Sequence, residues 1–113
     1  DLSNFDTAQT TDMSRMFYGC ENLRYVKLGS FTNRKLVNVD NMFYGCTNLE
    51  TIDFSGFKTD NVNRFNSMFE NCTKISSIDL SNFDTSNVHT MNSMFSGCKN
   101  LTSIKMFFKL CAH

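Results

Sequence analysis

Cysteine is the residue type in this chain with the widest range of chemistry, and four cysteines recur at a fixed spacing of 26 positions. They are Cys20, Cys46, Cys72 and Cys98. A cysteine cluster can bind zinc, form disulfides or supply a nucleophilic thiolate. Zinc needs thiolates that converge in a tetrahedron, whereas thiols one repeat apart would lie in a row and point into a core. We therefore predict buried free thiols that behave as small apolar side chains, with a disulfide between neighbouring repeats as the alternative.

Three other residues whose side chains could bind a metal or react lie outside this row of thiols: Cys111, His89 and His113. Cys111 is the thiol that we expect solvent and oxidants to reach. His89 has no second histidine near it in the repeat, so we interpret it as a solvated surface residue. His113 ends the chain and is compatible with an expression tag. We predict no catalytic residue, no metal site and no cofactor, and we expect the chain not to be an enzyme.

A second column of residues carries charge through the segments that we expect to be strands. It consists of Asp1, Lys27, Asp53, Asp79 and Lys105. Alternation along a strand places this column on the open face of a sheet. Unlike neighbours can form ion pairs there, whereas Asp53 and Asp79 would repel each other and could hold calcium weakly. We interpret the column mainly as a solvated surface that could also bind a partner. The predicted partner-binding face consists of Tyr25, Lys27, Thr51, Asp53, Ser77, Asp79, Ser103 and Lys105.

These columns belong to four near-identical repeats with a period of 26 positions. A Met-Phe pair precedes each of the four cysteines. Apolar residues recur three, six and eight positions after each cysteine. A further column contains only phenylalanine, at Phe5, Phe31, Phe57 and Phe83. Matching columns at one period are the signature of a repeat architecture, in which each unit buries its apolar side chains against the next.

Two hydrophobic periods within each repeat predict its local structure. Residues 49–54 end in an alternating pattern that is typical of a short strand. Residues 62–72 space their apolar side chains by three, three, one and three positions, which predicts one face of a helix of at most about three turns. Polar residues such as 84–87 supply N-cap oxygens. The expected helix ends carry residues that tolerate a left-handed backbone, namely Gly19, Gly45, Asn71 and Gly97.

A strand, a helix and an equivalent strand must pair in parallel with a right-handed crossover. The expected fold is therefore α/β: a right-handed β/α solenoid of leucine-rich-repeat type, with four repeats at a period of 26 positions, a parallel sheet on one face and short helices on the other. We expect residues 1–113 to form one solenoid domain, and to be a fragment of a longer repeat protein.

Short segments of the chain resemble the repeats of two known families. Residues 23–28 (Leu-Arg-Tyr-Val-Lys-Leu) and 75–80 (Ile-Ser-Ser-Ile-Asp-Leu) resemble the strand motif of leucine-rich repeats. Residues 79–88, followed by Met-Phe-Ser-Gly-Cys at 94–98, resemble the BspA-like repeat of bacterial surface proteins. That family consists largely of secreted or cell-wall-linked proteins and lipoproteins. The resemblance implies adhesion and protein binding, and it supplies no catalytic residues.

Charge and hydropathy narrow the partners that we expect. Eleven basic and eleven acidic residues cancel, so no basic field exists to attract nucleic acid, and no apolar run is long enough to insert into a membrane. We expect a non-enzymatic protein-binding or adhesion module at the cell surface or secreted, whose ligand is a protein or a host surface. The alternative is a structural subunit that associates through the solenoid ends into a fibre or sheath.

Overall fold

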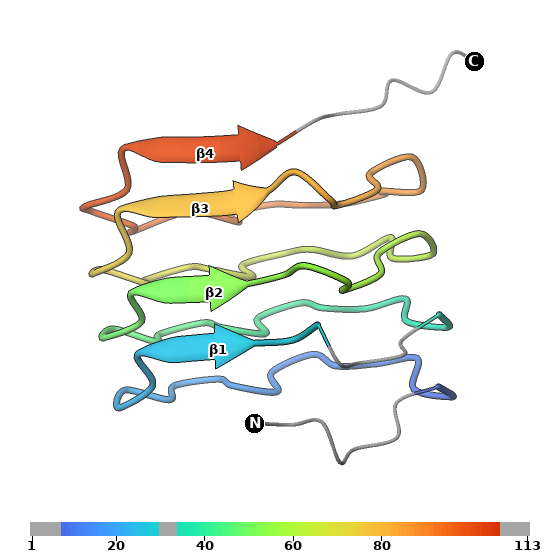
Figure 1. Cartoon of the computed structure of the whole chain (residues 1–113), viewed down its shortest axis with the longest axis horizontal. Helices are drawn as coiled ribbons and strands as arrows, with labels where there is room; N and C mark the ends of the chain where they lie inside the picture. Colours follow the sequence, from blue (N-terminus) through green and yellow to red (C-terminus); the bar gives the residue numbers. More distant parts are fainter. Residues whose placement is uncertain (1–7, 30–33, 107–113) are drawn as a thin grey trace.

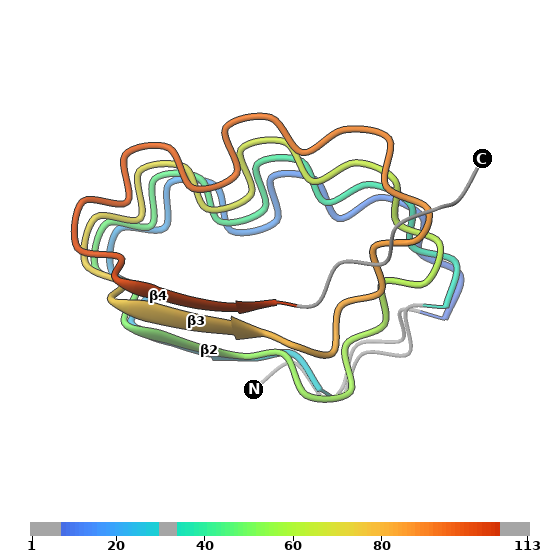
Figure 2. The same ribbon diagram turned by 90° about the horizontal axis from the view of Figure 1, so that it is seen from above.

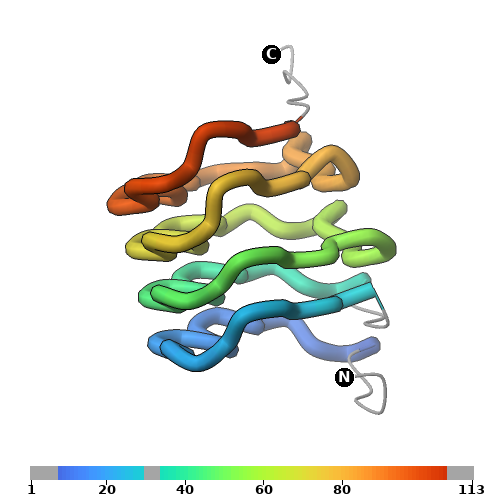
Figure 3. The backbone as a smooth tube through the Cα atoms, turned by 60° about the vertical axis from the view of Figure 1, so that its left-hand side comes forward, coloured from blue at the N-terminus to red at the C-terminus, as the bar shows by residue number. Residues whose placement is uncertain are grey.

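The chain winds through successive coils that stack on one another, one coil for each repeat (Figure 1; Figure 3). This arrangement comes from a computed structural model that describes residues 8–29 and 34–106. Each coil contributes one short strand at the same place in the repeat. The strands are β1 (Tyr25–Lys27), β2 (Thr51–Asp53), β3 (Ser77–Leu80) and β4 (Ser103–Met106).

The strands pair in parallel with a register of one repeat. Val26 lies opposite Ile52 between β1 and β2, and Ile78 lies opposite Ile104 between β3 and β4. The prediction of short parallel strands is therefore confirmed. The prediction of one continuous sheet is wrong, because the four strands form two separate two-stranded sheets, β1-β2 and β3-β4.

The predicted helices are also wrong, because the residues that the structure describes contain no helix. The segment expected to be helical is a string of turns. Met16 N–H donates to the carbonyl of Met13 at 3.2 Å, and Cys20 N–H donates to that of Phe17 at 3.1 Å. Alternate amides point instead to the next coil, as Phe17 N–H does to Met42 O at 2.8 Å. The chain is thus not an α/β solenoid with helices on one face.

The name turn wall is used for residues 13–20 together with their equivalents one, two and three repeats later. Figure 2 shows it as the undulating side of the stack, opposite the strands. Its amides and carbonyls bond from coil to coil, and bridges at its edge join Asp12 to Asn38, Asn38 to Arg64 and Arg64 to Thr90. Within the described part of the chain, no helix has the length and apolar character needed to cross a membrane.

Left-handed backbone is the physical reason why the turn wall is not helical. Two columns of residues have φ between 55° and 76°. They are Arg15, Asn41, Ser67 and Ser93, and Gly19, Gly45, Asn71 and Gly97. A left-handed residue every four positions reverses the chain before a helical hydrogen bond from residue i to i−4 can form. The left-handed conformation predicted for the glycine column is confirmed, although it serves turns rather than helix ends.

The core stacks each repeated side chain on its own equivalent. The rings of Phe17, Phe43, Phe69 and Phe95 form one column, with neighbouring centroids 5.2, 5.7 and 5.7 Å apart and planes within 7° of parallel. Phe43, Phe69 and the leucines Leu28 and Leu80 of the strand side are fully buried. Because every coil repeats the same apolar positions, each coil covers the apolar side chains of the coil before it.

Candidate functional site

The eight residues predicted to bind a partner all lie on the four strands. Their register pairs are Tyr25 with Thr51, Lys27 with Asp53, Ser77 with Ser103, and Asp79 with Lys105. Seven of them are exposed and Asp53 is half-buried. We call this set the strand face. The alternation that was predicted along the strands is clear in β3, where the buried Ile78 and Leu80 alternate with the exposed Ser77 and Asp79.

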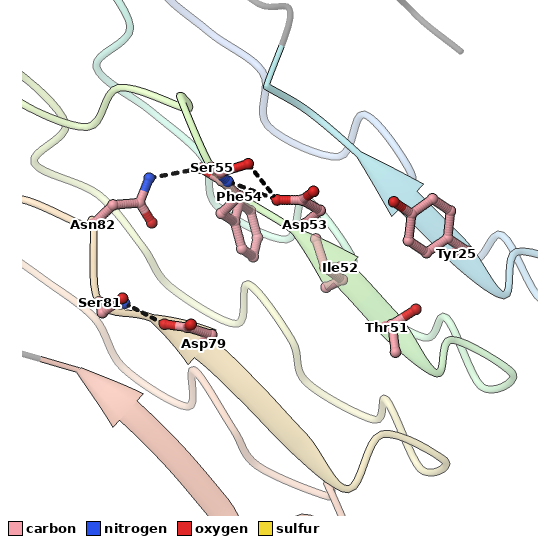
Figure 4. Close-up of a pocket in the computed structure, with 9 residues that line it drawn as sticks. All are labelled: Tyr25, Thr51, Ile52, Asp53, Phe54, Ser55, Asp79, Ser81 and Asn82. Carbon is pink, nitrogen blue, oxygen red and sulfur yellow. Dashed lines mark hydrogen bonds between the residues drawn. The ribbon is translucent and has the colours of Figure 1, made fainter.

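A hollow of about 360 Å³ opens on the strand face where β2 meets β3 (Figure 4). Its lining residues are Tyr25, Thr51, Ile52, Asp53, Phe54, Ser55, Asp79, Ser81 and Asn82. Four of the predicted residues, Tyr25, Thr51, Asp53 and Asp79, therefore share one site. The other four, Lys27, Ser77, Ser103 and Lys105, lie on the same strands outside the hollow.

The hollow lies where the sheet is interrupted. Figure 1 shows β2 and β3 further apart than the strands within either sheet. Phe54, directly after β2, is bulkier than its equivalents in the neighbouring coils, which are Leu28 and Leu80. The Phe54 ring packs edge-on against Phe83, with centroids 4.9 Å apart. Asn82 partly replaces the missing ladder, since its side-chain amide donates to the carbonyl of Phe54 at 2.6 Å.

Two carboxylates flank this interruption in a well-defined geometry. The Oδ1 atom of Asp53 accepts hydrogen bonds from the amide and hydroxyl of Ser55, at 2.9 and 2.6 Å. The Oδ1 atom of Asp79 accepts one from the amide of Ser81 at 2.9 Å. These serine bonds lower the pKa of Asp53 and of Asp79, and the charges of Lys27 and Lys105 lower them further. Both side chains are thus anionic at neutral pH, and both line the hollow.

The row of cysteines is structural rather than reactive. All four are free thiols, as predicted, and the predicted burial is confirmed for Cys46 and Cys72, whereas Cys20 and Cys98 are half-buried. Burial raises the pKa of Cys46 to about 11 and that of Cys72 to about 12, so these thiols stay protonated and poorly nucleophilic. The pKa of Cys98 is raised for the same reason.

Sequence reasoning missed that these thiols act as hydrogen-bond donors between coils. Cys46 Sγ donates to the carbonyl of Phe17 at 3.1 Å, and Cys72 Sγ does so to Phe43 at 3.1 Å. Cys98 repeats the contact, in this case to Phe69 at 3.0 Å. Each of these carbonyls already accepts the amide of the cysteine three positions later in its own coil, so the thiol of the next coil is a second donor to it. The fixed spacing of the cysteines was the sequence signal for these hydrogen bonds, although packing of the thiols as small apolar side chains explained that spacing equally well.

A polar network on the turn wall was also missed. Asp40, which is 8% exposed, accepts hydrogen bonds from Arg64 Nε and the amide of Asn66, both at 2.8 Å. Arg64 also forms an ion pair with Asp40 at 2.7 Å. One repeat later, Asn66 Oδ1 accepts the amide of Asn92 at 2.7 Å. The recurrence of Asp or Asn at these three positions was visible in the sequence and indicates one structural role.

The remaining predicted residues have simple placements. His89 is exposed, as expected for a surface histidine. No group of three or more His, Cys, Asp or Glu side chains that could hold a metal occurs in residues 8–29 and 34–106, so no third residue of these types joins Asp53 and Asp79 there. Asp1, Cys111 and His113 lie outside the described residues.

Comparison with known proteins places the chain in a family. Neither a search of curated proteins nor a search of solved structures returned a match. The family described as "Mycoplasma protein of unknown function, DUF285" matches residues 1–107, which is nearly the whole chain. Its match spans all four coils, including the strand face and the row of thiols. The chain therefore belongs to the DUF285 family.

Proposed function

We propose that this chain is a protein-binding module of a BspA-like repeat protein that is secreted or displayed at a cell surface, and that it binds its partner with the strand face. The observation that carries the proposal is that the strand face combines exposed side chains with a shaped hollow. Tyr25 is 56% exposed on it, so an amphipathic aromatic ring is available to a partner. Parallel strands stacked in register hold these side chains in fixed positions, which lowers the entropy lost on binding.

Binding accounts for this chemistry better than catalysis does. The two carboxylates at the hollow are held in the charged state by hydrogen bonds, so neither has the near-neutral pKa that suits proton transfer. The thiols of Cys46 and Cys72 are buried and protonated, so neither is an activated nucleophile. The resemblance to BspA-like repeats supports adhesion or protein binding as the role, and a protein or host-surface ligand as the partner.

The test is a peptide-display selection against the whole chain, followed by binding measurements on matched variants. Tyr25→Ala removes an exposed aromatic ring from the strand face. Tyr18→Ala is the control, because Tyr18 is 48% exposed on the turn wall and stacks on Tyr44 with centroids 4.8 Å apart. We expect Tyr25→Ala to weaken the selected peptides at least tenfold and Tyr18→Ala to leave their affinity unchanged.

Two results would overturn this proposal. Selected peptides that respond to Tyr18→Ala but not to Tyr25→Ala would move the binding surface to the turn wall. Rods that lengthen over a hundredfold range of protein concentration, seen by light scattering and electron microscopy, would favour the structural-subunit alternative, with self-association through the ends of the stack.

A further inference from the structure

We infer that the hollow between β2 and β3 binds the guanidinium group of an arginine on a protein partner, presented by an extended segment with an acidic residue two positions to either side. This inference rests on the proposed function and names the partner chemistry of the same face. Three features carry it: the interruption of the sheet, the order of charges along the strand face, and the lining of the hollow.

The interruption makes this site unlike any other place on the described strand face. The strands on either side of it pair with their outer neighbours in a regular ladder, whereas β2 and β3 do not pair. Opposite them the coils remain in contact, because the bridges from Asn38 to Arg64 and from Arg64 to Thr90 continue along the turn wall. The stack is therefore intact behind the hollow and open in front of it, which leaves a preformed depression for a side chain.

The charges along the strand face have a definite order. From β1 to β4 the charged column consists of Lys27, Asp53, Asp79 and Lys105, so two anions lie at the centre between two cations. The serine amides bond the Oδ1 atoms of Asp53 and Asp79, at 2.9 Å in each case. Neither carboxylate forms an ion pair with a lysine or arginine among the described residues. Two anionic carboxylates on adjacent coils complement a cationic donor that can contact both.

The lining favours arginine over a small cation. Ile52 and the ring of Tyr25 provide apolar surface for the aliphatic stem of a long basic side chain. The hydroxyl groups of Thr51 and Ser81 add polar partners around its head. A guanidinium presents donors on two edges of a plane, so one group can bond Asp53 with one edge and Asp79 with the other, and it can also stack on Tyr25.

The spacing of the coils defines the flanking residues of the partner. Paired strands lie about 5 Å apart and the unpaired β2 and β3 lie further apart, so the four charges span more than roughly 15 Å along the stack. An extended segment that runs along the stack returns its side chains to the same side about every 6.6 Å. An arginine seated between Asp53 and Asp79 therefore places the residues two positions away near Lys27 and Lys105. Acidic residues at those two positions complete the charge complementarity.

The experiment uses a synthetic probe, the blocked peptide Gly-Glu-Ser-Arg-Ser-Glu-Gly, titrated into the whole chain with detection by amide chemical shifts. We expect saturable shifts at β2 and β3. Asp53→Asn and Asp79→Asn should each weaken binding at least fivefold, and both retain the oxygen that accepts the serine amide. Asp12→Asn is the matched control, because Asp12 accepts the amide of Ser14 in the same way at 2.8 Å but lies beside the turn wall.

A second peptide with the charges inverted, Gly-Lys-Ser-Glu-Ser-Lys-Gly, should bind at least tenfold more weakly. Three results would overturn the inference: equal binding of the two peptides, unchanged affinity in both Asp→Asn variants, or no chemical-shift changes at β2 and β3 with 10 mM of the first peptide. That concentration is well above the millimolar dissociation constant expected for a single exposed contact. Display-selected peptides that lack a basic residue but still depend on Tyr25 would also overturn it, and would leave the proposed function standing.

Discussion

Alkaline pH should destabilise this protein through its two most buried thiols. Burial raises the pKa of Cys46 to about 11 and that of Cys72 to about 12 in the folded chain, whereas a thiol in an unfolded chain titrates near 8.5. Below about pH 8.5 both states keep the protons and the thiols contribute their full stability. As the pH rises from there toward the folded pKa values, the unfolded state holds fewer protons than the folded state, so the free energy of unfolding falls.

The size of the effect follows from the two pKa values. Each pH unit between the unfolded and the folded pKa is worth about 1.4 kcal/mol for each thiol. Between pH 8 and pH 10, Cys46 and Cys72 should therefore each remove roughly 2 kcal/mol, or roughly 4 kcal/mol together. Both side chains are fully buried, so solvent screens little of this effect. A loss of that size is a large part of the roughly 5–15 kcal/mol that stabilises a typical domain.

The assay is urea unfolding followed by circular dichroism at pH 8, 9 and 10, for the native chain and for the double variant Cys46→Ser and Cys72→Ser. Serine does not titrate in this range, and its hydroxyl can still donate to the carbonyls that the thiols contact. All other titratable groups are the same in the two proteins, so the difference between the two pH dependences reports the two substituted thiols. If the two proteins lose the same free energy of unfolding between pH 8 and pH 10, within about 0.5 kcal/mol, the reasoning is refuted.

Three further predictions concern the contacts between coils. Gly29→Ala should lower the free energy of unfolding by at least about 2 kcal/mol, because the added Cβ would lie 2.3 Å from a backbone carbonyl of the next coil. At Gly19 an added Cβ meets nothing within 4 Å, so Gly19→Ala should cost only about 1 kcal/mol for its left-handed backbone. Equal losses of the two variants in urea unfolding would contradict this. Arg64→Met should cost about 1–3 kcal/mol, since it removes the ion pair and the hydrogen bond of a nearly buried carboxylate. A free energy of urea unfolding equal to that of the native chain would contradict this. Deletion of residues 47–72, which is one whole repeat, should leave a shorter stack that unfolds cooperatively. Deletion of residues 47–71 should abolish cooperative unfolding, because it shifts every later inward side chain by one position. Calorimetry distinguishes the two results.

Repetition made much of this fold predictable from the sequence. The strands, their parallel pairing and the one-repeat register follow from apolar columns that recur once in every repeat. The row of free cysteines and the left-handed column that begins at Gly19 follow from the same alignment. These features depend on local patterns and on the contact of each coil with its neighbour, and both can be read from one repeat.

The helices were predicted wrongly because spacing alone does not distinguish a helix from a string of turns. Turns that reverse the chain every four residues also return an apolar side chain to the core every three or four positions. The decisive residues were those of the second left-handed column, Arg15, Asn41, Ser67 and Ser93. Only Asn41 among them is a type that favours this conformation, so hydrogen bonds to the next coil, rather than intrinsic preference, impose it there.

The position of the hollow could not be predicted, because it depends on departures from the repeat rather than on the repeat itself. Phe54 replaces leucine in its column, and its contact with Phe83 joins residues 29 positions apart that no local pattern connects. In a stack of equivalent coils, identical side chains give identical surfaces, and no coil is then a better site than another. A partner can recognise one place on such a stack only where the sequence breaks its own period. The interruption between β2 and β3, with its two adjacent carboxylates, is such a place on the strand face, which is why the strand-face variants at this interruption are the ones that test what the protein binds.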